Sequence, residues 1–522
     1  MARTEALDHE VLVVGAGFGG IGAGIALHRA GVDDFVLVDK WPGVGGTWLA
    51  NTYPGVAVDI PAFVYSFSFE QRSDWSRLFA PGEEIRRYAE TVVDKYGLRP
   101  KLRLNTTLTR CAFDEDQDLW RVSTDGGEEI TARFLIPAVG GLERPKLPDI
   151  DGISDFGGTL MHTAIWDHDV DLAGKRVAVI GTGATSLQLV PEVARVAAHL
   201  TVFQRTPIWV SPKIDFKVGP LGRLALSQPL LRAWLRASGT LGAEIGIAGA
   251  LLWPDGVGAV LRRGAERSLR AWMRSQVDDP VLRDKLTPQY ALGCKRPSMS
   301  NTYLKTFGRD HVDLVTEPIE RVTQTGVVTS DGVEHPVDVL VCATGFQVME
   351  QGTTPPFPVL GRSGVDLREF WHEYRYQAYQ GVSVPGYPNL FMITGPHGFV
   401  PGSYFWMVEA TAAHAARAIA AARRRGATNV EIRQEPHDQY FRQCNQRAAK
   451  TMLFTENCAA SNTYYINYQG DAAALRPTLH AEMWWQNRFF PLDHYRYSSY
   501  RTAPSRSTIR ASGARLSRGA PQ

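Results

Sequence analysis

The feature that most constrains this fold is a glycine-rich turn that occurs twice, each time between a short apolar strand and an apolar helix. The first copy, Gly15 to Gly20, reads GAGFGG, and the second, Gly181 to Ser186, reads GTGATS. Glycines allow a tight turn and let the backbone approach a pyrophosphate, whose charge the helix N-terminus stabilises. Ser186 replaces the usual third Gly or Ala, so the second turn alone is the weaker signal. The repeat predicts an α/β fold with two dinucleotide-binding domains.

The residue after the second strand of each unit distinguishes the two nucleotides. In the first unit a strand over 35–38 ends at Asp39, at the offset from which a carboxylate reaches the ribose hydroxyls of adenosine. In the second unit Arg205 and Thr206 occupy the same offset, after a strand over 200–204. A cation there matches a 2′-phosphate, which a carboxylate repels. Two Rossmann-like domains are therefore predicted, the first for FAD and the second for NADPH.

Composition excludes several classes of function. Lys and Arg number 56 against 54 Asp and Glu, so the net charge of +2 gives no case for nucleic-acid binding. The five cysteines are scattered and contain no C-x-x-C, so we predict no disulfide framework, no metal site and no dithiol redox centre, with the cytoplasm as compartment. The polar start argues against a secretory signal. The apolar stretch 237–253 contains Glu244 and several glycines, so a helical cap is expected there and not a membrane span.

A stretch between the two turns has the spacing F-x-G-x-x-x-H-x-x-x-W-D. The residues that define it are Phe156, Gly158, His162, Trp166 and Asp167. This stretch resembles the fingerprint of the flavin-dependent Baeyer-Villiger monooxygenases, a family of class B flavoprotein monooxygenases. Its histidine and tryptophan are expected to couple nucleotide binding to domain movement and not to touch the substrate.

Two further motifs carry the same resemblance, which covers about 11–497. Residues from Gly46 to Asp59 fit G-x-W-x-x-x-x-Y-P-G-x-x-x-D, and the run from Gly293 to Arg296 resembles the active-site loop of the family. The resemblance implies that flavin reduced by NADPH reacts with dioxygen to form a peroxide, which inserts one oxygen atom next to a ketone carbonyl to give an ester or lactone. Arg296 would stabilise the negative charge, and Asp59 would hold that arginine.

The candidate cofactor contacts follow from the turns and from the resemblance together. Those for FAD are Gly15, Gly17, Phe18, Gly20, Asp39, Lys40, Gly46, Thr47, Trp48, Asp59 and Tyr65. Those for NADPH are Gly181, Thr182, Gly183, Ala184, Thr185, Ser186, Arg205, Thr206, Lys295 and Arg296. The family usually has Glu where this chain has Asp39, which is a conservative departure.

The motifs divide the chain into five segments. We predict the first part of an FAD-binding domain at 1–145, a linker with the fingerprint at 146–172, an NADP-binding domain at 173–345 with a helical insertion at about 213–283, the second part of the FAD-binding domain at 346–497, and a disordered basic tail at 498–522. A strand is expected over 389–393. The aromatic cluster Trp484, Trp485, Phe489 and Phe490 is equally compatible with a core and with a substrate wall.

Two other functions remain open from the residues alone. An N- or S-oxygenating flavin monooxygenase would share both domains and a similar fingerprint, although Trp166, Asp167 and Arg296 favour oxygen insertion into a ketone. A flavin-binding sensor without turnover is disfavoured by the presence of Asp59, Lys295 and Arg296. The expected partners are a small ketone and dioxygen, in a monomer or homodimer, and the particular ketone cannot be read from the sequence.

Overall fold

The first sheet forms where short β-branched runs alternate with turns. The computed structural model describes residues 7–456, 458, 461 and 463–499. The strands of this sheet are β1 (His9–Val14), β2 (Phe35–Val38), β3 (Leu102–Arg103), β4 (Leu108–Asp114), β5 (Leu119–Thr124), β6 (Glu129–Pro137) and β17 (Val359–Leu360). Their order is β17-β4-β5-β6-β1-β2-β3. β1 pairs in parallel with β2 and β6, whereas β5 pairs antiparallel with β4 and β6.

Helices from both ends of the chain cover this sheet. Helix α1 (Phe18–Arg29) packs against α12 (Tyr404–Arg425), and α3 (Gly82–Lys95) buries one apolar face. A Cβ on Gly22 of α1 would lie 2.4 Å from a methyl of Val408, so the absence of a side chain lets the helices approach. The chain after the second nucleotide unit therefore returns to the first sheet.

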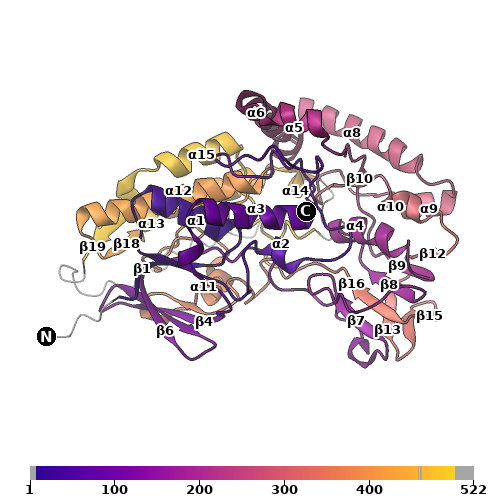
Figure 1. The fold of residues 1–522 in the computed structure, drawn as a ribbon, viewed down its shortest axis with the longest axis horizontal. Coiled ribbons are helices and arrows are strands. Elements are labelled where there is room, and N and C mark those ends of the chain that lie inside the picture. Colours follow the sequence, from indigo (N-terminus) through magenta and orange to yellow (C-terminus); the bar gives the residue numbers. More distant parts are fainter. Residues whose placement is uncertain (1–6, 457, 459–460, 462, 500–522) are drawn as a thin grey trace, which may run out of the picture.

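The second sheet is entirely parallel. Its strands are β7 (Thr159–His162), β8 (Arg176–Ile180), β9 (His199–Phe203), β12 (Val312–Val315) and β16 (Val339–Cys342), in the order β12-β9-β8-β16-β7. Helix α4 (Ala184–Val193) follows β8, and an antiparallel sheet of β13 (Ile319–Val322), β14 (Gly326–Thr329) and β15 (Glu334–Pro336) lies beside it. Figure 1 shows the two nucleotide units as left and right halves of the molecule, which confirms the predicted α/β class.

Two local predictions differ from the structure. The fingerprint was assigned to a linker, but Thr159–His162 forms β7 at the edge of the second sheet and pairs with β16. The strand expected over 389–393 does not form in the described residues, where an isolated bridge between Leu390 and Leu135 is the pairing recorded. Leu390 is nevertheless buried, so its apolar segment packs on the first sheet without extending it.

The insertion is helical, and it contacts both halves. It contains α5 (Pro220–Ser227), α6 (Pro229–Ala243), the π-helical turn Glu244–Ala248, α7 (Gly249–Leu252), α8 (Val257–Arg274) and α9 (Pro280–Lys285), which lie along the top and right of Figure 1. The sequence predicted a cap over the NADP-binding half alone. The insertion also contacts the first half, because the Arg236 side chain of α6 donates a hydrogen bond to the carbonyl oxygen of Ser66 at 2.7 Å. No helix within the described part of the chain is long and apolar enough to cross a membrane.

The remaining elements complete the first half and the connections. They are α2 (Thr47–Ala50), β10 (Val210–Ser211), β11 (Ser298–Met299), α10 (Tyr303–Thr306), α11 (Leu367–Tyr374), β18 (Asn429–Ile432), α13 (Gln434–Ala448), α14 (Met452–Thr455), α15 (His480–Phe489) and β19 (Tyr495–Ser498). In the aromatic cluster of α15, Phe490 is buried, whereas Trp485 and Phe489 face solvent, so most of the cluster is not core. The disordered tail predicted at 498–522 begins too early, because Ser498 is the last residue of β19, and residues 500–522 lie outside the described residues.

Candidate active site

The two glycine turns adopt the same backbone conformation. Gly15 and Gly181 have φ angles of 108° and 110°, a left-handed region that glycine adopts without strain. A Cβ on Gly15 would lie 2.7 Å from the carbonyl oxygen of Ala138, and one on Gly181 would lie 2.5 Å from that of Ala343. Both positions therefore require glycine for two reasons: the positive φ angle and the lack of room for a Cβ.

The helices after the turns present free N-termini. Gly17 and Gly183 are the N-caps of α1 and α4, with φ of −74° in both and ψ of −176° and −171°. Among the described residues, no side chain caps either helix and no acid lies in its first turn. The unpaired N–H groups and the positive end of each helix dipole are thus available to a phosphate. Two turns of this kind fit two dinucleotides.

Ser186 explains why the second turn tolerates its departure from the usual glycine pattern. Its side chain is fully buried, and its hydroxyl donates to the carbonyl oxygen of Gly181 at 2.8 Å. In the first turn, Gly20 fills the equivalent position, and a Cβ there would lie 1.8 Å from the carbonyl oxygen of Gly15. The second turn therefore accommodates a side chain at this position and hydrogen-bonds it, whereas the first turn has room only for glycine.

Asp39 lies beside the first turn, at the carboxyl end of β2. Its carboxylate accepts hydrogen bonds from the backbone N–H of Ala16 at 2.6 Å and of Trp41 at 2.9 Å. Burial raises the pKa of Asp39, and the two backbone donors oppose that shift. The neighbouring Lys40 forms an ion pair with Glu143, and its contact with a nucleotide stays a prediction.

The predicted flavin-side loop folds back onto the first turn. Gly46 has a φ of 56°, and a Cβ there would lie 3.0 Å from the Cα atom of Gly17. Thr47 then begins α2, and the indole of Trp48 donates to the hydroxyl of Tyr65 at 3.1 Å. The sequence-predicted members of this loop are therefore brought together at the N-terminus of α1.

Phe18 supports this region from within the core. Its ring is 3% exposed and packs against Phe405 with ring centroids 4.6 Å apart, and against Phe67 at 5.9 Å. Because the ring points into the protein, Phe18 can contact a cofactor only through its backbone. Of the groups of Phe18, only the main-chain N–H stays a predicted cofactor contact.

Two cations gather beside the second turn. Arg205 follows β9 and is exposed, and burial together with the nearby charge of Arg205 lowers the pKa of Lys295 to about 8. Within the described residues, neither cation forms a recorded ion pair with an acid. Thr182 ties the turn to this region, since its hydroxyl donates to the carbonyl oxygen of Thr206 at 2.9 Å. Adjacent cations without an acid suit a phosphate that carries two negative charges.

The depressed pKa of Lys295 gives a testable pH dependence. Lys295 carries its charge below pH 8 and loses it above, so kcat/KM for NADPH is expected to fall by about 10-fold between pH 7 and pH 9.5, the scale of one charge-assisted contact. Lys295→Arg keeps its charge over this range and serves as the control. An alkaline loss of equal size in Lys295→Arg would show that another group titrates. NADH, which lacks the 2′-phosphate, should show no such loss.

Arg296 and Asp59 form an ion pair across the two halves. The guanidinium Nη2 lies 2.7 Å from Asp59 Oδ1, although the residues are 237 positions apart. The charge of Asp59 raises the pKa of Arg296, so the guanidinium stays protonated at every physiological pH. Their side chains are 38% and 30% exposed, and Tyr464 and Tyr465 lie near the guanidinium. The predicted catalytic pair is thus assembled, with one face open.

Gln188 joins the two halves, and the sequence did not single it out. Its side-chain oxygen accepts from the hydroxyl of Tyr53 at 3.0 Å and from the N–H of Ala57 at 3.2 Å, while its amide donates to the carbonyl of Ala57 at 2.9 Å. Gly55 has no room for a side chain, because a Cβ there would lie 2.6 Å from the carbonyl oxygen of Gln188. The only sign of this contact in the sequence is that Gln188 is a polar residue within the apolar run of α4.

The central fingerprint residues lie on and after β7, the edge strand of the second sheet. His162 is 6% exposed, its Nδ1 accepts from the N–H of Ala164 at 3.1 Å, and its ring meets that of Phe346 edge-on at 6.1 Å. Burial lowers the pKa of His162. Gly158 is required for space, because a Cβ would lie 2.4 Å from the carbonyl oxygen of Asp338.

The last two fingerprint residues differ in their surroundings. Trp166 packs on the core of the NADP-binding half, whereas Asp167 is exposed and accepts from the N–H of Asp169 at 2.9 Å. The Asp167 carboxylate therefore stabilises a local turn. The predicted coupling role of the fingerprint stays a prediction.

The cysteine prediction was wrong in one respect. Cys294 and Cys458 form a disulfide, while the other three cysteines are free and buried. No spacing rule could reveal the pair, because the two cysteines are 164 residues apart and meet only when the chain folds. The crosslink lies directly before Lys295 and Arg296.

Two parallel nucleotide units with an arginine–carboxylate pair between them define a flavoprotein oxidoreductase that uses two dinucleotides. In agreement, residues 12–223 match the family described as pyridine nucleotide-disulphide oxidoreductase. A Baeyer-Villiger monooxygenase of Pseudomonas aeruginosa is 38% identical over 451 residues, which cover 86% of this chain and 84% of that protein. A Baeyer-Villiger monooxygenase of Streptomyces coelicolor is 36% identical over 520 residues, with 98% and 97% covered. The crystal structure of OTEMO in complex with FAD and NADP superposes with a TM-score of 0.83 at 27% identity, over 95% of this chain and 100% of that one.

The chain therefore belongs to the Baeyer-Villiger monooxygenases, and the predicted enzyme class is confirmed. The N- or S-oxygenating alternative is not favoured.

Proposed function

We propose that this chain binds FAD at the first turn and NADPH at the second, and that it inserts one atom of dioxygen next to the carbonyl of a small ketone. FAD and NADPH are the cofactors of this enzyme, as its fold and family imply. The single observation that carries the proposal is the Arg296–Asp59 pair, which joins the NADP-side loop to the flavin-side loop at 2.7 Å. The product is an ester or a lactone.

The residues present fit both cofactors. Each turn offers an uncapped helix N-terminus, Asp39 stands beside the first turn, and Arg205 with Lys295 stand beside the second. When bound, the flavin supplies the chemistry: it accepts hydride from NADPH and then activates dioxygen.

The chain itself has three tasks in this reaction. Trp48 and Tyr65, which share a hydrogen bond, would shield the flavin side from water and so limit the loss of activated oxygen as hydrogen peroxide. Arg296 supplies a permanent positive charge toward the oxygen that becomes negative during insertion. Asp59 holds the guanidinium in place and leaves its remaining donors free to turn toward the reacting atoms.

The partners follow from this chemistry. A ketone and dioxygen are the proposed substrates, and the cytoplasm, where NADPH is supplied, is the proposed compartment. One chain contributes both turns and the Arg296–Asp59 pair, so a monomer is sufficient and a homodimer is compatible. A panel of linear, cyclic, aryl and steroidal ketones, scored for NADPH consumption coupled to product, tests the function. Oxidation of an added sulfide without any ester would support the N- or S-oxygenating class instead.

Arg205 gives a prediction for cofactor choice. Arg205→Ala is expected to raise the KM for NADPH by about 10-fold or more, because one or two charge-assisted hydrogen bonds to the 2′-phosphate are lost. The KM for NADH should change little. The measurement is steady-state kinetics with both nucleotides, and the exposed Arg263 of α8, replaced by alanine, is the control. Equal losses with NADPH and NADH would show that Arg205 does not contact the 2′-phosphate.

A further inference from the structure

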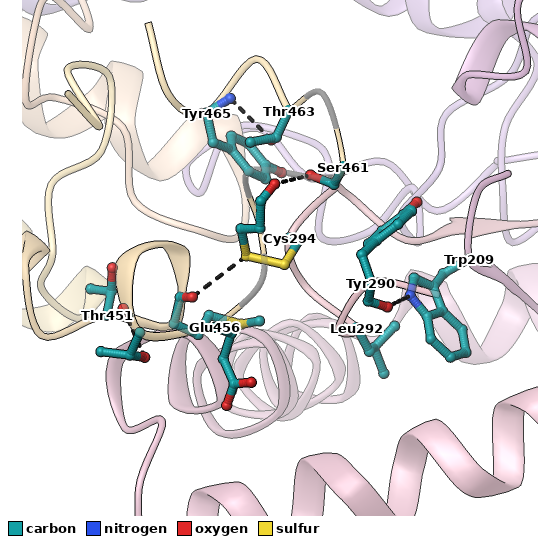
Figure 2. Close-up of a disulfide and its surroundings, with 12 residues drawn as sticks. Trp209, Tyr290, Leu292, Cys294, Thr451, Glu456, Ser461, Thr463 and Tyr465 are labelled. Carbon is teal, nitrogen blue, oxygen red and sulfur yellow. Dashed lines mark hydrogen bonds between the residues drawn. A yellow bond between two sulfur atoms is a disulfide. The ribbon is translucent and has the colours of Figure 1, made fainter. Parts of the chain in front are cut away.

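The loop that carries Lys295 and Arg296 is covalently attached to a distant part of the chain. Cys294, the residue before Lys295, is joined to Cys458, and both side chains are fully buried. Figure 2 shows the disulfide between the segment of Tyr290 and Leu292 and the segment of Ser461 and Tyr465. The crosslink is therefore one residue away from the proposed NADPH contact and two from the proposed catalytic arginine.

The two segments also pack against each other at the crosslink. Gly293 has a φ of 105°, and a Cβ there would lie 2.7 Å from the sulfur of Met452. The carbonyl of Met452 lies 3.5 Å from Cys458 Sγ, and the hydroxyl of Ser461 donates to the carbonyl of Cys458 at 2.7 Å. Gly293 thus permits the close approach that brings the two sulfurs together.

An ionic cluster on the insertion ties the same two segments a second time. Arg262 of α8 is 4% exposed and pairs with Glu456 and, at 3.7 Å, with Glu266. Glu266 in turn accepts from the backbone N–H of Leu292 at 2.8 Å. Figure 2 shows Glu456 and Leu292 near the disulfide, on the two joined segments. The position of the Lys295–Arg296 loop therefore depends on the segment that follows α14.

That segment also reaches the proposed catalytic arginine. Tyr464 and Tyr465 lie a few residues after Cys458 and close enough to the Arg296 guanidinium to interact with its charge. Loop and segment are thus joined by the disulfide, and the two tyrosines of the segment lie within electrostatic range of Arg296. Breaking the crosslink would therefore free both the loop that carries Arg296 and the segment that carries the two tyrosines.

We propose that Cys294–Cys458 is a redox-reversible modification site that controls the position of Lys295 and Arg296. In the oxidised chain the loop is fixed for NADPH. A dithiol reductant breaks the S–S bond by thiol–disulfide exchange, supplies two electrons and two protons to give two thiols, and is itself oxidised to a disulfide. Disulfides that form in reducing compartments are commonly transient or redox-sensing, which matches a reversible role in an NADPH-using enzyme. The proposal rests on the proposed function, because Lys295 and Arg296 take their roles from it.

The structure predicts the direction of the effect. Without the bond, the loop is held by packing, by the Arg262 cluster and by the Arg296–Asp59 pair, so it samples more positions than the crosslinked loop does. Reduction is expected to raise the KM for NADPH by about 5-fold, the scale of weakening one charge-assisted contact. It should also divert a larger share of consumed NADPH into hydrogen peroxide, because Arg296 is no longer held at the reacting oxygen. FAD should stay bound, since the first turn is not connected to the crosslink.

The first experiment uses the full-length FAD-loaded enzyme without substitution. Alkylation under denaturing conditions should label three cysteines before reduction and five after it, because one disulfide and three free thiols are present. Both sulfurs are buried, so reduction requires local opening, and NADP⁺ bound to the loop should slow it. Five labelled thiols in protein treated with oxidised glutathione would overturn the proposal. An NADP⁺-independent reduction rate would also contradict it.

The second experiment separates the crosslink from its neighbours. Cys458→Ser removes the bond without altering the 293–296 loop, and it should reproduce the reduced enzyme and no longer respond to dithiothreitol. Cys444→Ser replaces a free buried cysteine of α13 and is the control that should respond as wild type does. Kinetics that are identical before and after a change from three to five thiols would overturn the proposal.

Binding separates failure of this proposal from failure of the proposed function. The Kd of NADP⁺ can be measured by fluorescence in both redox states without any turnover. If no ketone is converted but the Kd still rises on reduction, the redox site stands and the reaction assignment falls. If ester forms equally well in both redox states and the Kd of NADP⁺ is unchanged, the reaction assignment stands and the redox proposal falls.

Discussion

Arg296→Ala is expected to lower ester formation by ~10²-fold or more while flavin reduction by NADPH continues, because the charge acts on oxygen insertion and not on folding. Within the described residues, Arg296 is the one cation that forms an ion pair with Asp59. The charge of Asp59 raises the pKa of Arg296 and keeps the guanidinium protonated. Without Arg296, no positive charge from this residue stabilises the oxygen that becomes negative during insertion. The consumed NADPH should then appear as hydrogen peroxide.

The test measures NADPH, hydrogen peroxide and ester in one vessel. Arg296→Lys should rescue poorly, since a point charge lacks the planar fork that binds Asp59 and the reacting oxygen at once. Arg263→Ala, on the exposed face of α8, should behave as wild type. Near wild-type ester from Arg296→Ala would remove the catalytic assignment of this residue.

Gly20→Ala is expected to abolish FAD retention and to destabilise the fold by about 3 kcal/mol, the upper range for forcing a methyl group into a packed site. The added Cβ would lie 1.8 Å from the carbonyl oxygen of Gly15 and 2.9 Å from its carbonyl carbon, so the turn itself must move. A displaced turn no longer presents the N-terminus of α1 to the pyrophosphate. The absorbance of bound flavin and the thermal denaturation midpoint report the two effects.

Gly19→Ala is the matched control on the same helix. Its Cβ would meet other atoms no closer than 3.4 Å, which is near ordinary contact. It should retain FAD, with a small change in stability. A flavin-loaded Gly20→Ala enzyme with the melting temperature of the wild type would contradict the account of the first turn.

The nucleotide units could be predicted because their signals are local. A strand, a glycine turn and a helix follow one another within a few residues, and β1, β2 and β8 form where the apolar runs predicted them. The contrast between Asp39 and Arg205 is likewise readable, since the offset from the turn fixes where each side chain lies. The joining of Arg296 to Asp59 was available only through the family resemblance.

The features that the sequence did not reveal all depend on distant segments. The disulfide and the Arg262 cluster join stretches more than 150 residues apart, so no periodicity or spacing encodes them. Gln188 looks like one polar residue on an apolar helix until the loop of Tyr53 is placed against it. The fingerprint was read as a linker because β7 is a short edge strand whose partner, β16, comes much later in the chain.

The most direct test of the central claim is an oxygen-label experiment on the FAD-loaded enzyme with NADPH and a converted ketone under ¹⁸O₂. The account predicts an ester or lactone that carries one ¹⁸O atom for each NADPH consumed, with the ketone oxygen unlabelled. NADPH oxidation that yields only hydrogen peroxide across the ketone panel, or labelled oxygen that appears only on an added sulfide or amine, would contradict it.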